Sequence, residues 1–129
     1  ALYMLGPLIT SGAAARLVVA RLKDESMAVS LSAANALHVM KHDAAPYVDE
    51  VEALLHSADE DARYIGLIAL GALGGEGGAG VHALSIAHRF QDEVDTVRCA
   101  ALDAITELGT EAAALVAERI ADALDDHCP

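Results

Sequence analysis

Apolar residues recur along this chain in blocks that repeat at intervals of 33 residues (62 − 29) and then 35 residues (97 − 62). The blocks cover residues 29–41, 62–74 and 97–109, and residues 1–6 match the end of a block. Repetition at a period of about 20–50 residues is typical of solenoids, in which each unit buries its apolar face against its neighbours. Three aligned columns hold only small or apolar residues: Ala1, Ala36, Ala69 and Ala104; Leu2, Leu37, Leu70 and Ile105; Leu5, Met40, Leu73 and Leu108.

Each block predicts a pair of helices, A and B. Helix A is expected at residues 26–40, 59–73 and 93–108, and helix B at residues 11–22, 45–56, 80–90 and 110–124. Ala15, Val18 and Leu22 illustrate the spacing that puts apolar residues on one face of helix B. No segment shows the alternation of a strand. We therefore predict one all-α domain over residues 1–129, with a partial repeat at 1–22 and repeats at about 23–56, 57–90 and 91–126.

The best-formed unit carries a motif that can be read residue by residue. It runs Asp-x-Val-Arg-x-x-Ala-x-x-Ala-Ile-x-x-Leu-Gly from Asp95 to Gly109. The preceding unit matches at Asp61, Arg63 and Gly74, whereas the second unit has Ser30 in place of the arginine. This motif resembles HEAT-like repeats, particularly the short repeats of the phycobilisome-lyase type. The resemblance spans essentially the whole chain and implies an α-solenoid of about three and a half helix pairs.

The resemblance also implies a structural ladder of ion pairs along the stack. In this family an aspartate in a turn commonly pairs with the arginine of the following repeat. By that resemblance Asp24 would face Arg63, and Asp59 would lie near Arg98. The alternative is a pair of arginines that binds a ligand, but their placement at the repeat period favours the ladder.

The charge of the chain restricts its partners. It contains 8 Lys and Arg against 20 Asp and Glu, for a formal net charge of −12. Such a field repels phosphate backbones and anionic membrane surfaces, so we expect no nucleic-acid binding. The apolar runs are too short to span a bilayer, so we expect no membrane insertion. The charge permits a basic protein partner, although it also serves solubility.

Cysteine usage bears on the compartment. Cys99 and Cys128 have no spacing signature, and Cys99 is expected to be a small buried residue beside the core columns. Nothing in the sequence requires an oxidising compartment. A soluble intracellular location, or an organellar lumen or stroma, is therefore favoured over secretion.

Candidate chemistry is sparse. The glycine-rich segment 74–80 lacks the lysine of a phosphate-binding loop and follows a helix, so we interpret it as a connecting loop. His38 and His42 have the spacing of a metal pair on a helix, but the sequence places no third ligand. We therefore predict no catalytic residue, no metal and no cofactor, and a protein that is not an enzyme.

The remaining candidate surface is the exposed face of the B helices, which lines the concave side of such an architecture. Its mixture of leucines and polar residues favours a protein-binding groove, although the leucines could instead extend the core. The candidate partner-binding residues are Arg16, Leu17, Asp49, Glu50, Ala53, Leu84, His88, Leu115 and Arg119.

Three functions compete for this architecture. We predict a non-catalytic interaction scaffold or a structural subunit of a larger assembly. The alternative is an enzyme subunit of the bilin-lyase type, which the repeat class suggests but which only three tyrosines and one phenylalanine support poorly. A DNA glycosylase of the HEAT-like kind would need a basic concave face, which the acidic charge excludes.

The N-terminal segment aligns with the end of a helix A and leaves apolar residues such as Leu2, Leu5 and Val18 short of cover. The ends of solenoids normally carry polar caps. We therefore expect the N-terminal end to be covered by more repeats or by another chain.

Overall fold

The computed structural model describes residues 2–75 and 78–127, and side chains within residues 12–75 and 78–118. The protein is all-α, because these described residues form helices joined by short turns and contain no strand. The all-α class expected from the sequence is confirmed.

The helices follow one another through tight connections. The α-helices are α1 (Leu2–Arg21), α2 (Met27–Ala36), α3 (Lys41–Ala44), α4 (Val48–Ala53), α5 (Glu60–Leu73), α6 (Ala83–His88), α7 (Asp95–Leu108) and α8 (Thr110–His127). Short 3-10 turns extend or join them at η1 (Ala45–Tyr47), η2 (Leu54–His56), η3 (Ala79–His82) and η4 (Arg89–Gln91).

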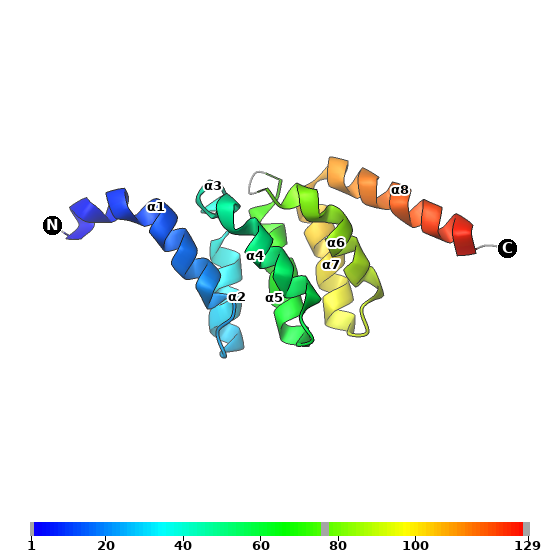
Figure 1. Cartoon of the computed structure of the whole chain (residues 1–129), viewed down its shortest axis with the longest axis horizontal. Helices are drawn as coiled ribbons and strands as arrows, with labels where there is room; N and C mark the ends of the chain where they lie inside the picture. The colour runs from blue at the N-terminus through cyan, green and yellow to red at the C-terminus, as the bar shows by residue number, and fades with distance from the viewer. Residues whose placement is uncertain (1, 76–77, 128–129) are drawn as a thin grey trace.

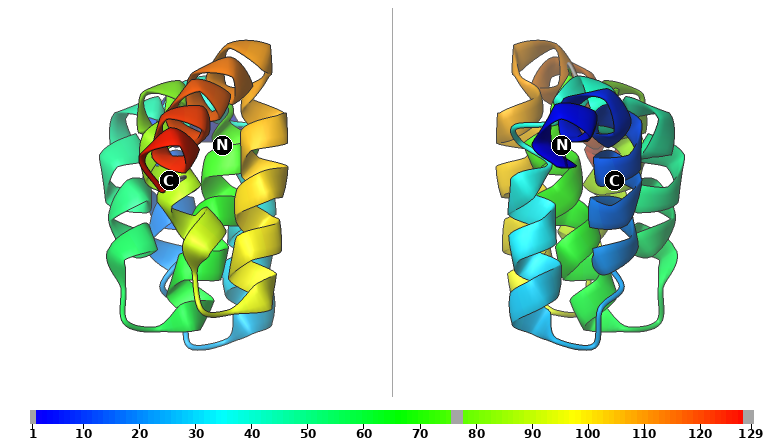
Figure 2. Two further views of the ribbon diagram at one scale, coloured as in Figure 1. Left: turned by 90° about the vertical axis from the view of Figure 1, so that its right-hand side faces the viewer. Right: turned by 90° about the vertical axis from the view of Figure 1, so that its left-hand side faces the viewer.

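The helices lie in two layers (Figure 1). In the first layer α2, α5 and α7 run side by side, and α5 packs against both neighbours. In the second layer α1, α4 and α6 lie along the first, and α8 packs beside α6 and α7. Figure 2 shows the two layers edge-on from either end of the stack. We refer to α2, α5 and α7 as the A layer, and to α1, α4, α6 and α8 as the B layer.

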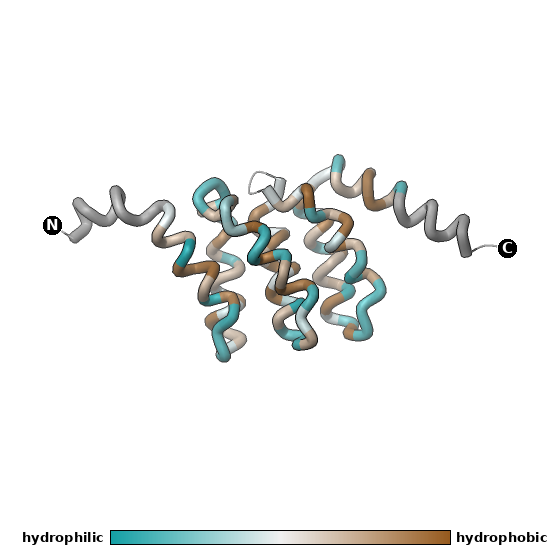
Figure 3. Tube along the Cα trace, in the orientation of Figure 1, coloured by the Kyte–Doolittle hydropathy of each residue, from teal (hydrophilic) through white to brown (hydrophobic). Residues whose placement is uncertain are grey.

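The core lies between the layers and is centred on α5. The side chains of Leu67, Leu70 and Leu73 are fully buried there, and Figure 3 shows the apolar residues gathered along this helix. Gly71 lies where α5 crosses α7, and a Cβ at this position would stand 3.2 Å from the Cα of Ala104. Glycine therefore permits a backbone approach that a larger residue would prevent.

Local sequence accounts for the ends of α5 and α7. Asp59 caps α5, because its carboxylate accepts a hydrogen bond from the N–H of Asp61 at 3.0 Å. Gly74 ends α5 with φ of 61°, and Gly109 ends α7 with φ of 102°. Both angles lie in the region that favours glycine, so both helix ends predicted from the sequence are confirmed.

Several expected boundaries are wrong. α1 is continuous from Leu2, without the break expected between residues 5 and 11. α2 ends at Ala36 instead of residue 40, because the N–H groups of His38, Val39 and Met40 bond to carbonyls three residues earlier and close tight turns. The expected B helices at 45–56 and 80–90 are each divided between an α-helix and 3-10 turns.

Candidate functional site

The turn between α6 and α7 holds a buried ion pair. The guanidinium of Arg63, in the first turn of α5, donates from Nε to Asp92 Oδ2 at 2.8 Å and from Nη2 to Asp92 Oδ1 at 3.1 Å. The same group donates from Nη1 to the carbonyl oxygens of Ser57 and Ala58. Arg63 therefore ties the turn before its own helix to the turn before the next A-layer helix. Such a bidentate, charge-assisted contact fixes both distance and orientation.

Burial and hydrogen bonding both change the pKa values of this pair. The side chains of Arg63 and Asp92 are 11% and 2% exposed. Burial raises the pKa of Asp92, but hydrogen bonds from Arg63 and the Val94 N–H, with the charges of Arg63 and Arg89, outweigh it and leave the pKa lowered. The hydrogen bond to Asp92 likewise outweighs burial and raises the pKa of Arg63. Both groups are therefore held in their charged forms.

Arg89 completes the cluster from the end of α6. Its Nη1 lies 3.4 Å from Asp92 Oδ2, and its Nε is buried without a hydrogen-bond partner among the described residues. The cluster places two guanidinium groups on one carboxylate, which is itself enclosed. Because the Asp92 side chain is only 2% exposed and its contacts join two turns, we interpret the cluster as a structural clamp.

The turns that lead into α2, α5 and α7 share one geometry. In each turn a side chain accepts a hydrogen bond from the backbone N–H two residues later: Asp24 from Ser26, Ser57 from Asp59, and Asp92 from Val94. In each turn the carbonyl of that residue accepts from a side chain six residues later: Ser30, Arg63 or Arg98. The hydrogen bonds within each turn therefore depend on the position of a residue in the repeat and not on its type.

The direction of the expected ion-pair ladder is wrong. Arg63 pairs with Asp92, not with Asp24, and Arg98 pairs with Asp95 and with the carbonyl of Asp92, not with Asp59. Asp59 serves as the cap of α5 instead. Arg63 reaches forward to the turn of the next unit along the chain, whereas Arg98 stays on the turn before its own helix, and the one-dimensional register did not specify this difference. Asp92 and Arg89 were not among the residues chosen from the sequence.

The equivalent turns before α2 and α5 leave a cavity. Serine stands at positions 30 and 57, where the next junction has Arg63 and Asp92. A cavity of about 430 Å³ lies between these turns. Its lining includes apolar side chains such as Leu54 and Ile65 and the acidic residues Asp24, Asp59 and Asp61. Its position matches the space that the Arg63 guanidinium fills one junction later. The absence of a long side chain at position 30 accounts for it.

The B layer carries the surface that the sequence singled out. Leu17 on α1 is 63% exposed and Leu115 on α8 is 41% exposed. Arg16, Asp49, Glu50, Ala53 and His88 are also exposed, whereas Leu84 is half-buried. The side chain of Arg119 lies outside the described residues. The described candidates therefore come from α1, α4, α6 and α8 of one layer.

Two polar contacts lie along the B layer, one between neighbouring units and one within a unit. Nε2 of His82 lies 3.0 Å from Oδ1 of Asp49, and Nε2 of His56 lies 2.8 Å from Oε1 of Glu52. Burial raises the pKa of Glu52, but hydrogen bonds from His56 and Ser85 outweigh it, and the pKa is lowered. Glu52 is therefore held in its charged form, and Asp49 contacts His82 of the following unit.

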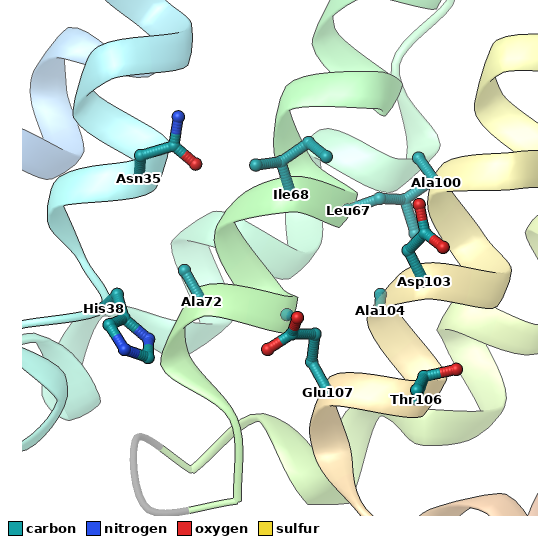
Figure 4. Close-up of a pocket in the computed structure, with 11 residues that line it drawn as sticks. Asn35, His38, Leu67, Ile68, Ala72, Ala100, Asp103, Ala104, Thr106 and Glu107 are labelled. Carbon is teal, nitrogen blue, oxygen red and sulfur yellow. The ribbon is translucent and has the colours of Figure 1, made fainter.

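The A layer has a separate depression of about 400 Å³ beside α5. Figure 4 shows Asn35 and His38 on one side of it and Asp103 and Glu107 on the other. These polar groups lie around an apolar floor that includes Ile68 and Ala72. Asn35, His38, Asp103 and Glu107 have no hydrogen bond to one another among the side chains that the structure describes.

The structure also places the histidines and the cysteine that the sequence analysis considered. His38 lies in the turn after α2 and His42 in α3, so they do not share a helix face as expected. Within the described residues, no three His, Cys, Asp or Glu side chains gather as they would around a metal ion. Cys99 is exposed on α7, so the expectation that it is buried is wrong. Cys128 lies outside the described residues.

No protein-family model and no curated protein matches the chain. Along residues 2–75 and 78–127, no helix combines the length and the apolar character that a membrane span requires.

Proposed function

We propose that this protein is a non-catalytic scaffold, an α-solenoid of HEAT-like helix pairs that binds a segment of another protein on its B layer. Three A-layer helices entered by the same hydrogen-bonded turn support the repeat architecture. On α1 and α4 the exposed positions recur at the same register, since Arg16 matches Asp49 and Leu17 matches Glu50. A surface of this kind offers contacts at regular intervals along an extended partner.

The observation that carries the proposal is the mixture of exposed groups on the B layer. Leu17 and Leu115 stand exposed toward its two ends, and the carboxylates of Asp49 and Glu50 are exposed on α4 between them. Exposed leucines beside charged groups are the composition of a binding surface with an apolar part and a polar rim. The formal net charge of −12 selects for a basic partner, because charge complementarity raises the association rate and disfavours acidic competitors.

A binding assay with peptides of defined charge tests this function. The probe is a fluorescein-labelled amphipathic helix of alternating lysine and leucine faces, and its counterpart has glutamate for lysine. We expect the lysine peptide alone to bind, as measured by fluorescence anisotropy, and its affinity to fall with increasing salt. Replacing Asp49 and Glu50 by lysine should weaken binding at least tenfold, because it reverses the charge facing the peptide.

The matched control changes the net charge equally but on another surface. Glu25 and Glu93 are exposed residues of the turns before α2 and α7, and both are replaced by lysine. We expect this control to keep most of the affinity. Equal loss in both variants would show that the probe senses only the overall field, and stronger loss in the control would place the contact on the turns. Either result would reject the B layer as the binding surface.

A further inference from the structure

The α1–α2 pair repeats the α6–α7 pair at a distance of 68 residues (92 − 24). Around the turn, Arg21, Asp24, Glu25 and Val29 correspond to Arg89, Asp92, Glu93 and Val97. The backbone follows the sequence: the N–H of Asp24 bonds to the carbonyl of Arg21 at 3.1 Å, as that of Asp92 bonds to Arg89 at 3.1 Å. The two carboxylates also accept equivalent N–H groups, from Ser26 at 2.9 Å and from Val94 at 3.0 Å.

The two pairs differ in what covers them. At α6–α7, the helix α5 packs against α7, and Val97 and Asp92 are 0% and 7% exposed. At α1–α2, the counterpart Val29 is 41% exposed, and Asp24 is only half-buried. A groove of about 320 Å³ runs between the two helices, lined by Leu17, Val18, Arg21, Val29, Ser32 and Ala33. The right-hand view of Figure 2 looks onto this end of the stack, where α1 and α2 lie side by side.

The chain itself shows what such a pair accepts. α5 presents to α7 an arginine, a leucine and a glycine at positions i, i+4 and i+8, namely Arg63, Leu67 and Gly71. The arginine takes the carboxylate of Asp92, the leucine is fully buried, and the glycine meets Ala104. The counterpart of Ala104 on α2 is Ala36, which is also small.

We propose that the α1–α2 groove is a docking site for an amphipathic helix of a partner protein, seated as α5 is seated on α6–α7. The partner helix carries arginine, an aliphatic residue and a small residue at i, i+4 and i+8, and its guanidinium binds the carboxylate of Asp24. The register of the internal interface specifies this occupant, because Asp24, in the turn that joins α1 and α2, holds the position from which Asp92 binds Arg63. The site is separate from the face around Asp49 and Glu50 and shares only Leu17 with the proposed B-layer surface.

The probe for this site is a synthetic peptide of residues 58–74, which contains the sequence of α5. A peptide of this length is only partly helical alone, so NMR titration of the isotope-labelled full chain is the suitable measurement. We expect shifts of the signals of Asp24, Val29 and Ser32. Asp24→Asn keeps the acceptor for the Ser26 N–H but removes the charge, and should weaken binding about tenfold or more. Val29→Asp should abolish binding, because it places a charge in the apolar groove.

Glu25→Gln is the matched control, because it removes the same charge one residue away, and it should leave the affinity within about twofold. The peptide with Arg63 replaced by glutamine should bind the unmodified chain more weakly. It should lose little further affinity when the chain carries Asp24→Asn, because the contact between the arginine and Asp24 is already absent. Shifts confined to Val97 and Asp92 would mean that the peptide displaces α5, and shifts at Asp49 and Glu50 would mean that it binds the B layer. Either pattern would overturn the proposal.

Sedimentation velocity without peptide tests the remaining occupant. We expect the unliganded chain to sediment independently of concentration. Association that rises with concentration and that Val29→Asp dissolves would assign the groove to a second copy and would overturn the proposal. Because Val29→Asp leaves Asp49 and Glu50 in place, the lysine–leucine peptide should still bind that variant, which separates failure here from failure of the B-layer function.

Discussion

The junction between α5 and α7 and the junction between α2 and α5 join the same kinds of helix but are closed differently. At the first, Gly71 meets Ala104 and the buried Arg63–Asp92 pair spans the two turns. At the second, Ser30 and Ser57 occupy the equivalent positions, and a cavity of about 430 Å³ lies between the turns. The apolar packing and the hydrogen bonds within each turn are common to both junctions.

This difference separates two sources of order in the stack. The hydrogen bonds within each turn are local and recur with serine or arginine, so they tolerate change of residue type. The contact between turns requires a long cationic side chain and a buried carboxylate together. A buried ion pair contributes little net stability against an apolar pair of equal size, but its geometry is specific, and removing one partner is costly. We therefore interpret the pair as fixing how α5 and α7 are placed.

The largest effect is expected from breaking the buried pair. Arg63→Ala leaves Asp92 charged and enclosed, so we expect it to lower the free energy of unfolding by about 3–5 kcal/mol. Arg98→Ala is the control, because this arginine holds the same place in its turn but its side chain is 40% exposed, and it should cost about 1 kcal/mol or less. Urea unfolding followed by circular dichroism measures both. Similar losses would show that position in the turn matters more than burial.

The close approach of α5 and α7 offers a second way to disturb the same junction. Gly71→Val places branched carbons against the backbone of Ala104, and we expect it to cost about 1–3 kcal/mol through overpacking. Gly12→Ala in α1 is the control, because its added Cβ meets no atom within 4 Å, and it should stabilise by up to about 1 kcal/mol. Thermal unfolding would contradict the packing argument if Gly71→Val were neutral.

Acid should weaken the closed junction selectively. The pKa of Asp92 is lowered from its ordinary value of 3.8, so its contribution to stability is present above that pH and is lost as the pH falls through the folded-state pKa. Asp92→Asn keeps an acceptor for the Val94 N–H but lacks the charge. We expect it to be about 1–3 kcal/mol less stable than the unmodified chain at neutral pH. The difference should shrink below pH 3.8, as measured by urea unfolding at several pH values.

The smallest expected effect comes from copying the ion pair into the open junction. Ser30→Arg with Ser57→Asp places the charged groups of Arg63 and Asp92 at the cavity, and aspartate can still accept the Asp59 N–H. Because the charges must be desolvated, we expect a gain of only about 0.5–1 kcal/mol. Each single variant should gain less than the pair. A double variant less stable than both singles would show that the two junctions differ in spacing as well as in residue type.

Much of the secondary structure could be predicted from short-range signals. Gly74 and Gly109 as helix ends act within one turn of helix, so their neighbours in sequence are their neighbours in space. The end of α2 was harder to predict from the sequence. Position 41 holds lysine where the other blocks have glycine, and a run of tight turns ends α2 where a glycine ends α5 and α7.

In the candidate site, too, the sequence predicted the local positions of residues but not their partners. Sequence placed Arg63 and Arg98 in the first turns of their helices, and it placed the exposed residues of α1 and α4 on the B layer. The resemblance chose Asp24 as the partner of Arg63 and was wrong, since Asp24 and Asp92 stand at the same position of their repeats and the structure pairs Arg63 with Asp92. The sequence prediction also mistook the side of α7 on which Cys99 lies.

The sequence alone determined the all-α class and the ends of α5 and α7, because these depend on periodicity and on contacts a few residues apart. Only the tertiary structure decided that Arg63 reaches forward to Asp92, that the α2–α5 junction contains a cavity, and that Val29 is exposed where Val97 is buried. Residues in one column have the same local environment, but their burial and their partners depend on which neighbouring helix packs against each side.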